Sequence, residues 1–221
     1  MTGSPWSAQL SSGTGSPGPP EPVWPAEPPG PQAWVREKLF DLRVVSLTGL
    51  LDDGRGSQVG AELMTLDAVG DGAVHLRIDS DGGSLSAALA LMDIIDVLGV
   101  PVRATCVGRI VGPAVGVLAV CSHRSMAPHA RVRLVEPNVE FAGRAGDLQQ
   151  MAAAHADQWR SFCSRVSEAT GQTLERVMDD ADRGAYLSAE EAVEYGLADE
   201  VMMPDAPLHR LPGRPIGFAP G

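Results

Sequence analysis

One strand-turn-helix segment constrains the fold of this chain more than any other. Residues 74–78 alternate apolar and polar side chains as a half-buried strand does, and the pair Gly82 and Gly83 follows them. Ser84 is then placed to cap a predicted helix over residues 85–98, which is apolar around most of its circumference. A helix of that kind must be covered on most sides, so we expect it to lie buried against a sheet.

Similar patterns continue on both sides of this segment and indicate a single α/β domain. Apolar runs typical of strands occur at residues 44–48, 101–107 and 132–135, and apolar residues at helical spacing occur at 58–69, 113–121, 144–169 and 173–181. Ser188 and Glu191 form a capping-box pattern that opens a last helix. With 221 residues and 44% hydrophobic content, the chain can bury a substantial core. We predict that residues 34–203 form this domain.

The two ends of the chain differ in composition from the rest. Residues 1–31 hold half of the 18 prolines and no Lys or Arg, which predicts a Pro/Gly-rich disordered tail over residues 1–33. Trp6 and Trp24 in this tail are either docking anchors for a partner or solvated residues. Residues 204–221 are predicted to form a flexible C-terminal tail. Neither a secretory signal nor a membrane-spanning run is found, so we expect a cytoplasmic protein without membrane contact.

Charge and cysteine content exclude several functional classes. The formal net charge of −11 argues against nucleic-acid binding, which needs clustered cations to contact phosphates. Cys106, Cys121 and Cys163 are an odd number without metal-ligand spacing, so neither a disulfide framework nor a zinc site is predicted. We expect three buried thiols in a reducing compartment and no cofactor or metal.

Several motifs, in order along the chain, resemble the proteolytic subunit of the Clp protease. They are Arg43-Val-Val-Ser-Leu-Thr-Gly49, Asp81-Gly-Gly-Ser84, Thr170-Gly-Gln-Thr-Leu-Glu175 and Leu187-Ser-Ala-Glu-Glu-Ala-Val-Glu-Tyr-Gly-Leu197. The similarity covers about residues 37–202. It implies the α/β fold that this family shares with crotonases, with repeated ββα units and a protruding long helix.

The resemblance also allows the catalytic positions to be compared one by one. The family needs a serine nucleophile, a histidine base and an aspartate that orients the histidine. The corresponding positions are Gly112, in a stretch without serine between Ser86 and Ser122, then Val135, and then Gly184. Glycine and valine carry no group for these roles, so we expect a degenerate triad and no peptidase activity.

The remaining parts of the family's site are only partly retained. Asp180 and Asp182 lie close to the third position, which leaves the loss of the orienting acid open. Gly82 and Gly83 match the glycine turn that supplies one oxyanion donor. The second donor is the backbone N–H of the residue after the nucleophile, and Pro113 has none. We interpret these residues as the remnant of an oxyanion hole.

Two carboxylates near these positions have alternative interpretations. Glu136 is either a base for a different reaction or the ion-pair partner of Arg109 or Arg133. Asp81 is interpreted as a cap of the following helix, and its negative charge would also oppose an oxyanion beside it, as expected at a site that has lost its function.

A Ser/His-rich stretch could imitate a catalytic cluster. It contains Ser122, His123, Ser125 and His129. Because a tight turn is predicted around residues 122–124, we interpret these side chains as solvent-exposed turn residues.

The resemblance further implies partners. Family members form seven-membered rings that stack through the long helix, and an unfoldase docks on the ring faces through hydrophobic pockets. The candidate ring-to-ring contact residues follow one stripe of the predicted helix 144–169, namely Leu148, Met151, Ala152, His155, Trp159 and Phe162. His75 and Arg77 replace two aromatic residues of the docking pockets, so docking of a Clp ATPase is not expected.

These observations lead to one main hypothesis and two alternatives. The main hypothesis is a non-catalytic homologue of the Clp proteolytic subunit that acts as a structural or regulatory ring subunit, with itself or with active subunits. The first alternative is a repurposed crotonase-like enzyme that uses Gly83 with Glu136 or Asp81. The second is an adaptor that recruits partners through the Pro-rich tail.

Overall fold

The computed structural model describes residues 31–203 of the chain. It begins with helix α1 (Pro31–Asp41), which the sequence patterns did not predict. Residues 1–30 and 204–221, and with them Trp6, Trp24 and the adaptor alternative, lie outside the described residues. No helix within residues 31–203 combines the length and the apolar character needed to cross a membrane.

A mixed sheet of seven strands forms the centre of the described fold. Five strands are parallel neighbours in the order β1 (Val44–Leu51), β2 (Val74–Gly83), β3 (Val102–Val111), β4 (His123–Met126) and β7 (Glu200–Val201). The end of β3 pairs instead with β5 (Arg131–Arg133), which is antiparallel to β6 (Tyr186–Ser188). The branch at the end of β3 is where the candidate site lies.

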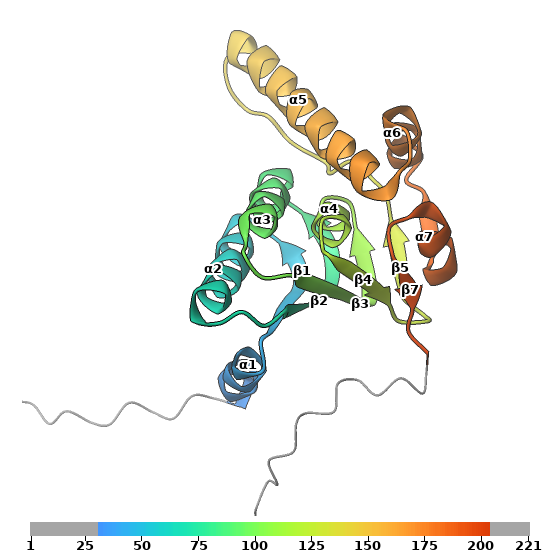
Figure 1. Ribbon diagram of the computed structural model, residues 1–221. Helices are drawn as coiled ribbons and strands as arrows, with labels where there is room; N and C mark the ends of the chain where they lie inside the picture. The colour runs from blue at the N-terminus through green and yellow to red at the C-terminus, as the bar shows by residue number, and fades with distance from the viewer. Residues whose placement is uncertain (1–30, 204–221) are drawn as a thin grey trace, which may run out of the picture.

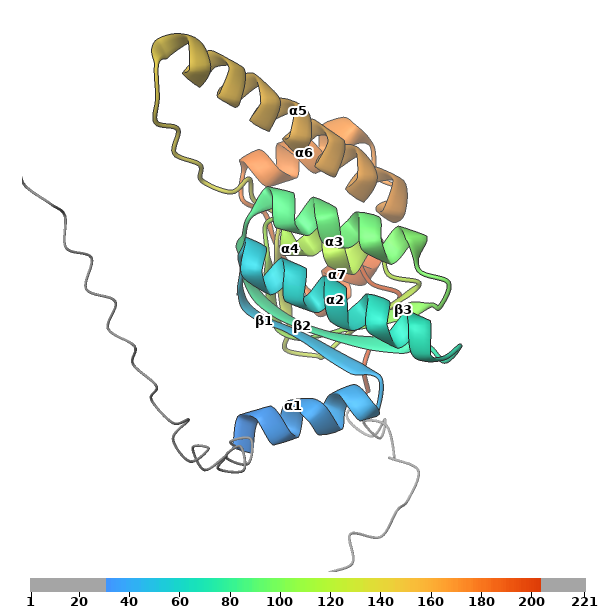
Figure 2. The same cartoon turned by 90° about the vertical axis from the view of Figure 1, so that its left-hand side faces the viewer.

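The helices cover one face of this sheet and extend beyond it. Three helices pack on that face, α2 (Asp53–Val69), α3 (Leu85–Val97) and α4 (Ala114–Ala119). Figure 2 shows α2 and α3 side by side, with the long helix α5 (Ala145–Thr170) on the far side of α3. Two short helices, α6 (Leu174–Asp182) and α7 (Ala189–Tyr195), complete the domain. This arrangement agrees with the expected α/β fold with one protruding long helix.

Strand β2 shows why the second face of the sheet is polar. Its residues alternate between buried and exposed, because successive side chains of a strand point to opposite faces. Leu76 and Ile78 are fully buried beneath the helices, whereas Arg77, Asp79 and Asp81 are exposed on the open face. The open face therefore carries charges along the strand that leads to Gly82.

Helix α5 has two different halves. Its N-terminal half reaches beyond the rest of the fold in Figure 1, and Met151 there is 45% exposed. In its C-terminal half Trp159 and Phe162 are 5% and 2% exposed, and their rings stack with centroids 5.1 Å apart. Both side chains are covered by the protein's own core, so the exposed part of the predicted contact stripe lies in the N-terminal half, and the stripe stays a prediction.

The predicted turn around residues 122–124 is also wrong. His123 begins β4, and this strand pairs in parallel with β3. Ser125 is 8% exposed, and its hydroxyl lies 3.0 Å from Oγ1 of Thr105 on β3. The strand forms because of pairing with a segment about twenty residues earlier, which local turn chemistry does not reveal.

The capping box that opens α7 is confirmed. The backbone N–H of Glu191 donates to Oγ of Ser188 at 3.2 Å, and the N–H of Ser188 donates to Oε2 of Glu191 at 2.7 Å. Both interactions join residues three apart, so a short sequence window contains everything needed to predict them.

Candidate functional site

Gly112 and Val135, predicted at the nucleophile and base positions, lie beside each other. Gly112 joins β3 to α4 with a φ of 52°, and its N–H donates to the carbonyl oxygen of Arg133 at 2.9 Å. An ideal Cβ on Gly112 would lie 3.0 Å from the carbonyl oxygen and 3.6 Å from Cγ1 of Val135. A side chain at the first position would therefore meet the second position directly, and neither residue carries a group that transfers a proton.

Gly184, predicted at the position of the orienting acid, lies against a cation. It follows α6 with a φ of 65°, and its N–H donates to the carbonyl oxygen of Ala181 at 3.0 Å. An ideal Cβ on Gly184 would lie 3.3 Å from Nη2 of Arg133. Because Arg133 is two residues before Val135 on the same chain segment, all three predicted positions belong to one region of the fold.

Nearby Asp180 is engaged elsewhere in the structure. Its side chain is almost completely buried, accepts a hydrogen bond from the hydroxyl of Tyr195 at 3.0 Å and forms an ion pair with Arg183. Burial, reinforced by this hydrogen bond and by the charge of Asp180, raises the pKa of Tyr195. Asp180 therefore holds α6 to α7. Asp182, the other acid near the third position, is exposed at the end of α6.

The glycine turn adjoins the same region. Gly83 has a φ of 140°, and a Cβ there would lie 2.1 Å from the carbonyl oxygen of Leu51, so only glycine fits. A Cβ on Gly82 would lie 3.4 Å from the carbonyl oxygen of Val111, the residue before Gly112. The N–H of Gly82 points to Oγ of Ser80 at 3.4 Å.

Pro113 forms the entrance to α4. Its φ of −58° and ψ of −29° are helical, and the six residues of α4 behind it are all buried. Proline at a helix start loses no helical hydrogen bond, because the N–H groups of the first turn have no partner within the helix. Gly112 and Pro113 thus make a good turn into a buried helix, while Pro113 offers no N–H to an oxyanion.

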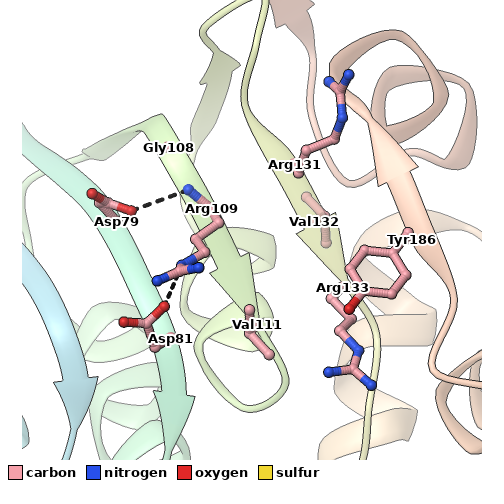
Figure 3. A pocket seen from close by; sticks show the side chains of 9 residues that line it. All are labelled: Asp79, Asp81, Gly108, Arg109, Val111, Arg131, Val132, Arg133 and Tyr186. Carbon is pink, nitrogen blue, oxygen red and sulfur yellow. Dashed lines mark hydrogen bonds and ion pairs between the residues drawn. The ribbon is translucent and has the colours of Figure 1, made fainter.

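The first of two clefts opens on the polar face of the sheet. Figure 3 shows its lining, and its volume is about 660 Å³. Arg109 on β3 forms an ion pair with Asp81 on the neighbouring strand β2, and the N–H of Arg109 donates to Oδ1 of Asp79 at 3.1 Å. The expectation that Asp81 caps the following helix was therefore wrong. Oγ of Ser84 accepts the capping hydrogen bond, from the N–H of Ala87 at 3.2 Å.

The second cleft lies between the glycine turn and α5, and its volume is about 550 Å³. Gly83 and His155 are among its lining residues. Nε2 of His155 is 3.2 Å from Oε1 of Glu136, and the ring of Phe141 packs edge-on against the imidazole. The expected pairing of Glu136 with Arg109 or Arg133 was therefore wrong. The extended segment between β5 and α5 runs alongside α5 and places Glu136 next to His155.

The Ser/His-rich stretch contributes no catalytic cluster at the candidate site. Oγ of Ser122 donates to the carbonyl oxygen of Val102 at 2.8 Å, and Nε2 of His123 lies 3.1 Å from Oε1 of Glu200. These contacts tie β4 to its neighbouring strands. None of the residues of this stretch lines either of the two clefts described above.

The predicted partner-contact residues divide by exposure. Met151 and Ala152 are exposed, Leu148 is half-buried, and His155 is held by Glu136. On β2, His75 is half-buried and Arg77 is exposed on the open face. The ring contact through α5 and the absence of docking by a Clp ATPase both stay predictions.

Sequence reasoning missed the stacking of Arg133 on Tyr186. The Cζ atom of Arg133 lies 5.0 Å from the centre of the Tyr186 ring. The antiparallel pairing of β5 with β6 places these two residues directly opposite each other. Only a prediction of that strand register could have found the contact, because the two residues are more than fifty positions apart.

The comparison with known families covers almost all of the described fold. A family model described as Clp protease matches residues 32–205. The match begins at the second residue of α1 and runs past β7, so it includes the glycine turn, the Gly112 turn and the long helix. The chain therefore belongs to the Clp protease family.

Proposed function

We propose that this chain is a catalytically inactive member of its family that acts as a structural or regulatory subunit of a ring in the cytoplasm. The contact between Gly112 and Val135 carries this proposal. A Cβ on Gly112 would start 3.0 Å from the Val135 carbonyl, which supports the assignment of both residues to the catalytic positions. Glycine and valine at these positions can neither attack a peptide nor accept a proton.

Loss of both groups has a large expected effect on rate. In enzymes with a catalytic triad, removal of the serine or the histidine lowers kcat on the order of 10⁶-fold. Pro113 also removes one oxyanion donor, which in such enzymes contributes a further factor of about 10² to 10³. The proposed subunit therefore retains the fold of the family and lacks its chemistry.

The exposed half of α5 supports a role in assembly. Met151 and Ala152 lie on a helix that extends away from the core, and Leu148 is only half-buried there. Apolar side chains in such a position gain stability when a second subunit covers them. The partner is a second copy of this chain or an active subunit of the family.

Docking of a Clp ATPase is not part of the proposal. Arg77 is exposed on β2, with the half-buried His75 two residues before it on the same face. An apolar loop that docked there would have to desolvate the guanidinium of Arg77, which is costly without a compensating anion.

The proposal is tested by measuring both assembly and activity. The full chain is purified alone and together with an active family member, and each sample is analysed by sedimentation velocity and with a fluorogenic peptide. We expect ring-sized particles in at least one sample and peptide cleavage only where the active subunit is present. A persistent monomer in both samples would contradict the assembly role, and cleavage by the chain alone would contradict the loss of catalysis.

A second candidate function is supported by the pair of His155 and Glu136. Nε2 of His155 lies 3.2 Å from Oε1 of Glu136, so the carboxylate orients the imidazole, and His155 lines the second cleft together with Gly83. This is the arrangement expected if a crotonase-like reaction used a new base beside the remaining glycine turn. The candidate is tested by thioester hydrolysis with the wild-type chain and with His155→Gln. Turnover that disappears in the variant supports it, and no turnover in either protein contradicts it.

A further inference from the structure

Three arginines line the first cleft, and only one of them has a buried N–H group without a hydrogen-bond acceptor within residues 31–203. Arg109 is paired with Asp81. Arg131 is exposed, and its Nη1 donates to the carbonyl oxygen of Ala130 at 3.0 Å. Nε of Arg133, in contrast, is shielded from solvent and has no hydrogen-bond acceptor within residues 31–203.

An N–H group of a cation that is buried without an acceptor is unusual. It has lost its hydrogen bonds to water and gained none from the protein, a loss that a bound anion would compensate. In Figure 3 Arg131 and Arg133 point to opposite ends of the cleft, so a single bound anion would not contact both guanidinium groups. Of the three buried side-chain donors without an acceptor within residues 31–203, on Arg43, Arg133 and Trp159, only that of Arg133 belongs to a residue that lines the first cleft.

The surroundings of Arg133 hold its guanidinium in one place. The ring of Tyr186, which is 66% exposed, lies 5.0 Å from Cζ, and stacking of this kind fixes the plane of the cation. On another side Gly184 leaves room for the guanidinium, because an ideal Cβ there would lie 3.3 Å from Nη2. A guanidinium positioned in this way is suited to bidentate binding of a planar anion.

We propose that Arg133 binds a carboxylate carried by an acidic peptide segment that enters the first cleft. A carboxylate matches the planar fork of the guanidinium. Asp79 and Asp81 line the same cleft and repel a phosphate dianion more strongly than a carboxylate. The cleft, at about 660 Å³ and open to solvent beside Tyr186, has room for a peptide side chain. This site is separate from the ring contact of the proposed function.

The first experiment measures binding by calorimetric titration of the full chain at low ionic strength. The probes are a Glu-Glu dipeptide blocked at both ends, sodium acetate and inorganic phosphate. We expect the dipeptide to bind, Arg133→Gln to weaken it at least tenfold, and the matched control Arg131→Gln to weaken it less than threefold. Equal weakening by both variants, preference for phosphate, binding of acetate without the dipeptide, or no binding at all would each overturn the proposal.

The second experiment supplies the carboxylate from within the chain. Gly184→Asp places an acid next to Arg133, whereas Gly184→Asn imposes the same backbone strain at a φ of 65° without the charge. We expect Gly184→Asp to melt at a higher temperature than Gly184→Asn and to lose dipeptide binding, which Gly184→Asn should retain. Equal melting temperatures together with equal dipeptide affinity in the two variants would show that Arg133 is not the anion-binding residue.

Discussion

Gly112 faces Val135 so closely that a side chain on the glycine would begin 3.0 Å from the valine carbonyl. A serine at this point therefore requires the backbone of residue 135 to move slightly, in addition to the left-handed φ of 52°. Restoring the catalytic groups is for that reason a test of how far the site has changed from an active one.

Peptidase activity should not return fully when only the three side chains are restored. We expect the variant Gly112→Ser, Val135→His, Gly184→Asp to cleave a fluorogenic peptide at least about 10²-fold more slowly than an active family member, because Pro113 supplies no N–H and Arg133 competes for the new carboxylate. Adding Pro113→Ala restores a donor that is worth a factor of about 10² to 10³ in rate. Full activity of the triple variant would contradict the importance of Pro113, and circular dichroism checks that each variant is folded.

The junction of α4 with α5 should not tolerate even one added methyl group. A Cβ on Gly116 would lie 2.3 Å from Cε2 of Phe162 and 2.6 Å from Sδ of Met92. We expect Gly116→Ala to lower the free energy of unfolding by about 1 to 3 kcal/mol in urea denaturation. The matched control is Gly146→Ala, which meets nothing within 4 Å near the start of α5 and should raise that free energy by up to about 1 kcal/mol. Equal midpoints for the two variants would contradict this packing.

The two halves of α5 should respond differently to substitution. Trp159→Ala removes a buried ring and is expected to cost about 3 to 5 kcal/mol in unfolding free energy. Met151→Glu changes a side chain that is 45% exposed and should alter stability by less than about 0.5 kcal/mol. In sedimentation velocity, Met151→Glu should show weaker self-association than the wild-type chain. Unchanged particles would place the ring contact of the proposed function elsewhere.

Asp199 should make folding stability depend on pH in the acid range. Burial raises the pKa of Asp199, but hydrogen bonds from the side chain and backbone of Arg124 outweigh this and hold it below the ordinary value of 3.8. Because the pKa is depressed in the folded state, the stabilisation is complete well above 3.8 and is lost as the pH falls through the lower folded value.

The test compares wild type with Asp199→Asn by urea denaturation between pH 7 and pH 2.5. We expect the variant to be less stable at pH 7 and the difference to shrink at the acid end of the range. Asp41→Asn serves as the control, because the Asp41 carboxylate is 56% exposed and its ion pair within residues 31–203 is the one with Lys38 on the surface of α1. A difference that stays constant with pH would contradict the assignment to Asp199.

The three thiols should be protected as long as the chain is folded. Burial raises the pKa of Cys106, Cys121 and Cys163 to about 12 in each case. Since the thiolate is the reactive form, iodoacetamide at pH 8 should label the native chain slowly and all three thiols rapidly in urea. Mass spectrometry counts the labels. Rapid labelling of any thiol in the native chain would show that its burial is incomplete.

The sequence predicts most reliably those features that depend on neighbouring residues. The capping box of Ser188 and Glu191 and the cap provided by Ser84 are local, and both are confirmed. The strand at His123 was missed because it depends on pairing with β3. The stripe on α5 was identified, but periodicity does not distinguish a face covered by the protein's own core, as at Trp159, from one that awaits a partner.

The candidate site was predictable to a different degree at each position. The resemblance located Gly112 and Val135, and the structure places them next to each other. The contacts of Gly184 with Arg133, and of Arg133 with Tyr186, follow from how β5, β6 and the end of α6 meet in space. No spacing in the sequence indicates such a meeting, because each contact joins segments that are distant along the chain.

Helix α5 joins two different environments. It is one continuous helix whose N-terminal half lies away from the core, while Trp159 and Phe162 anchor its C-terminal half in the core. The ring of Phe162 packs against Gly116 on α4. Gly116 lies four residues after Gly112, whose turn leads into α4. The anchored half of α5 and the Gly112 turn therefore share a packing contact through α4, although the outer half of the same helix lies away from the core.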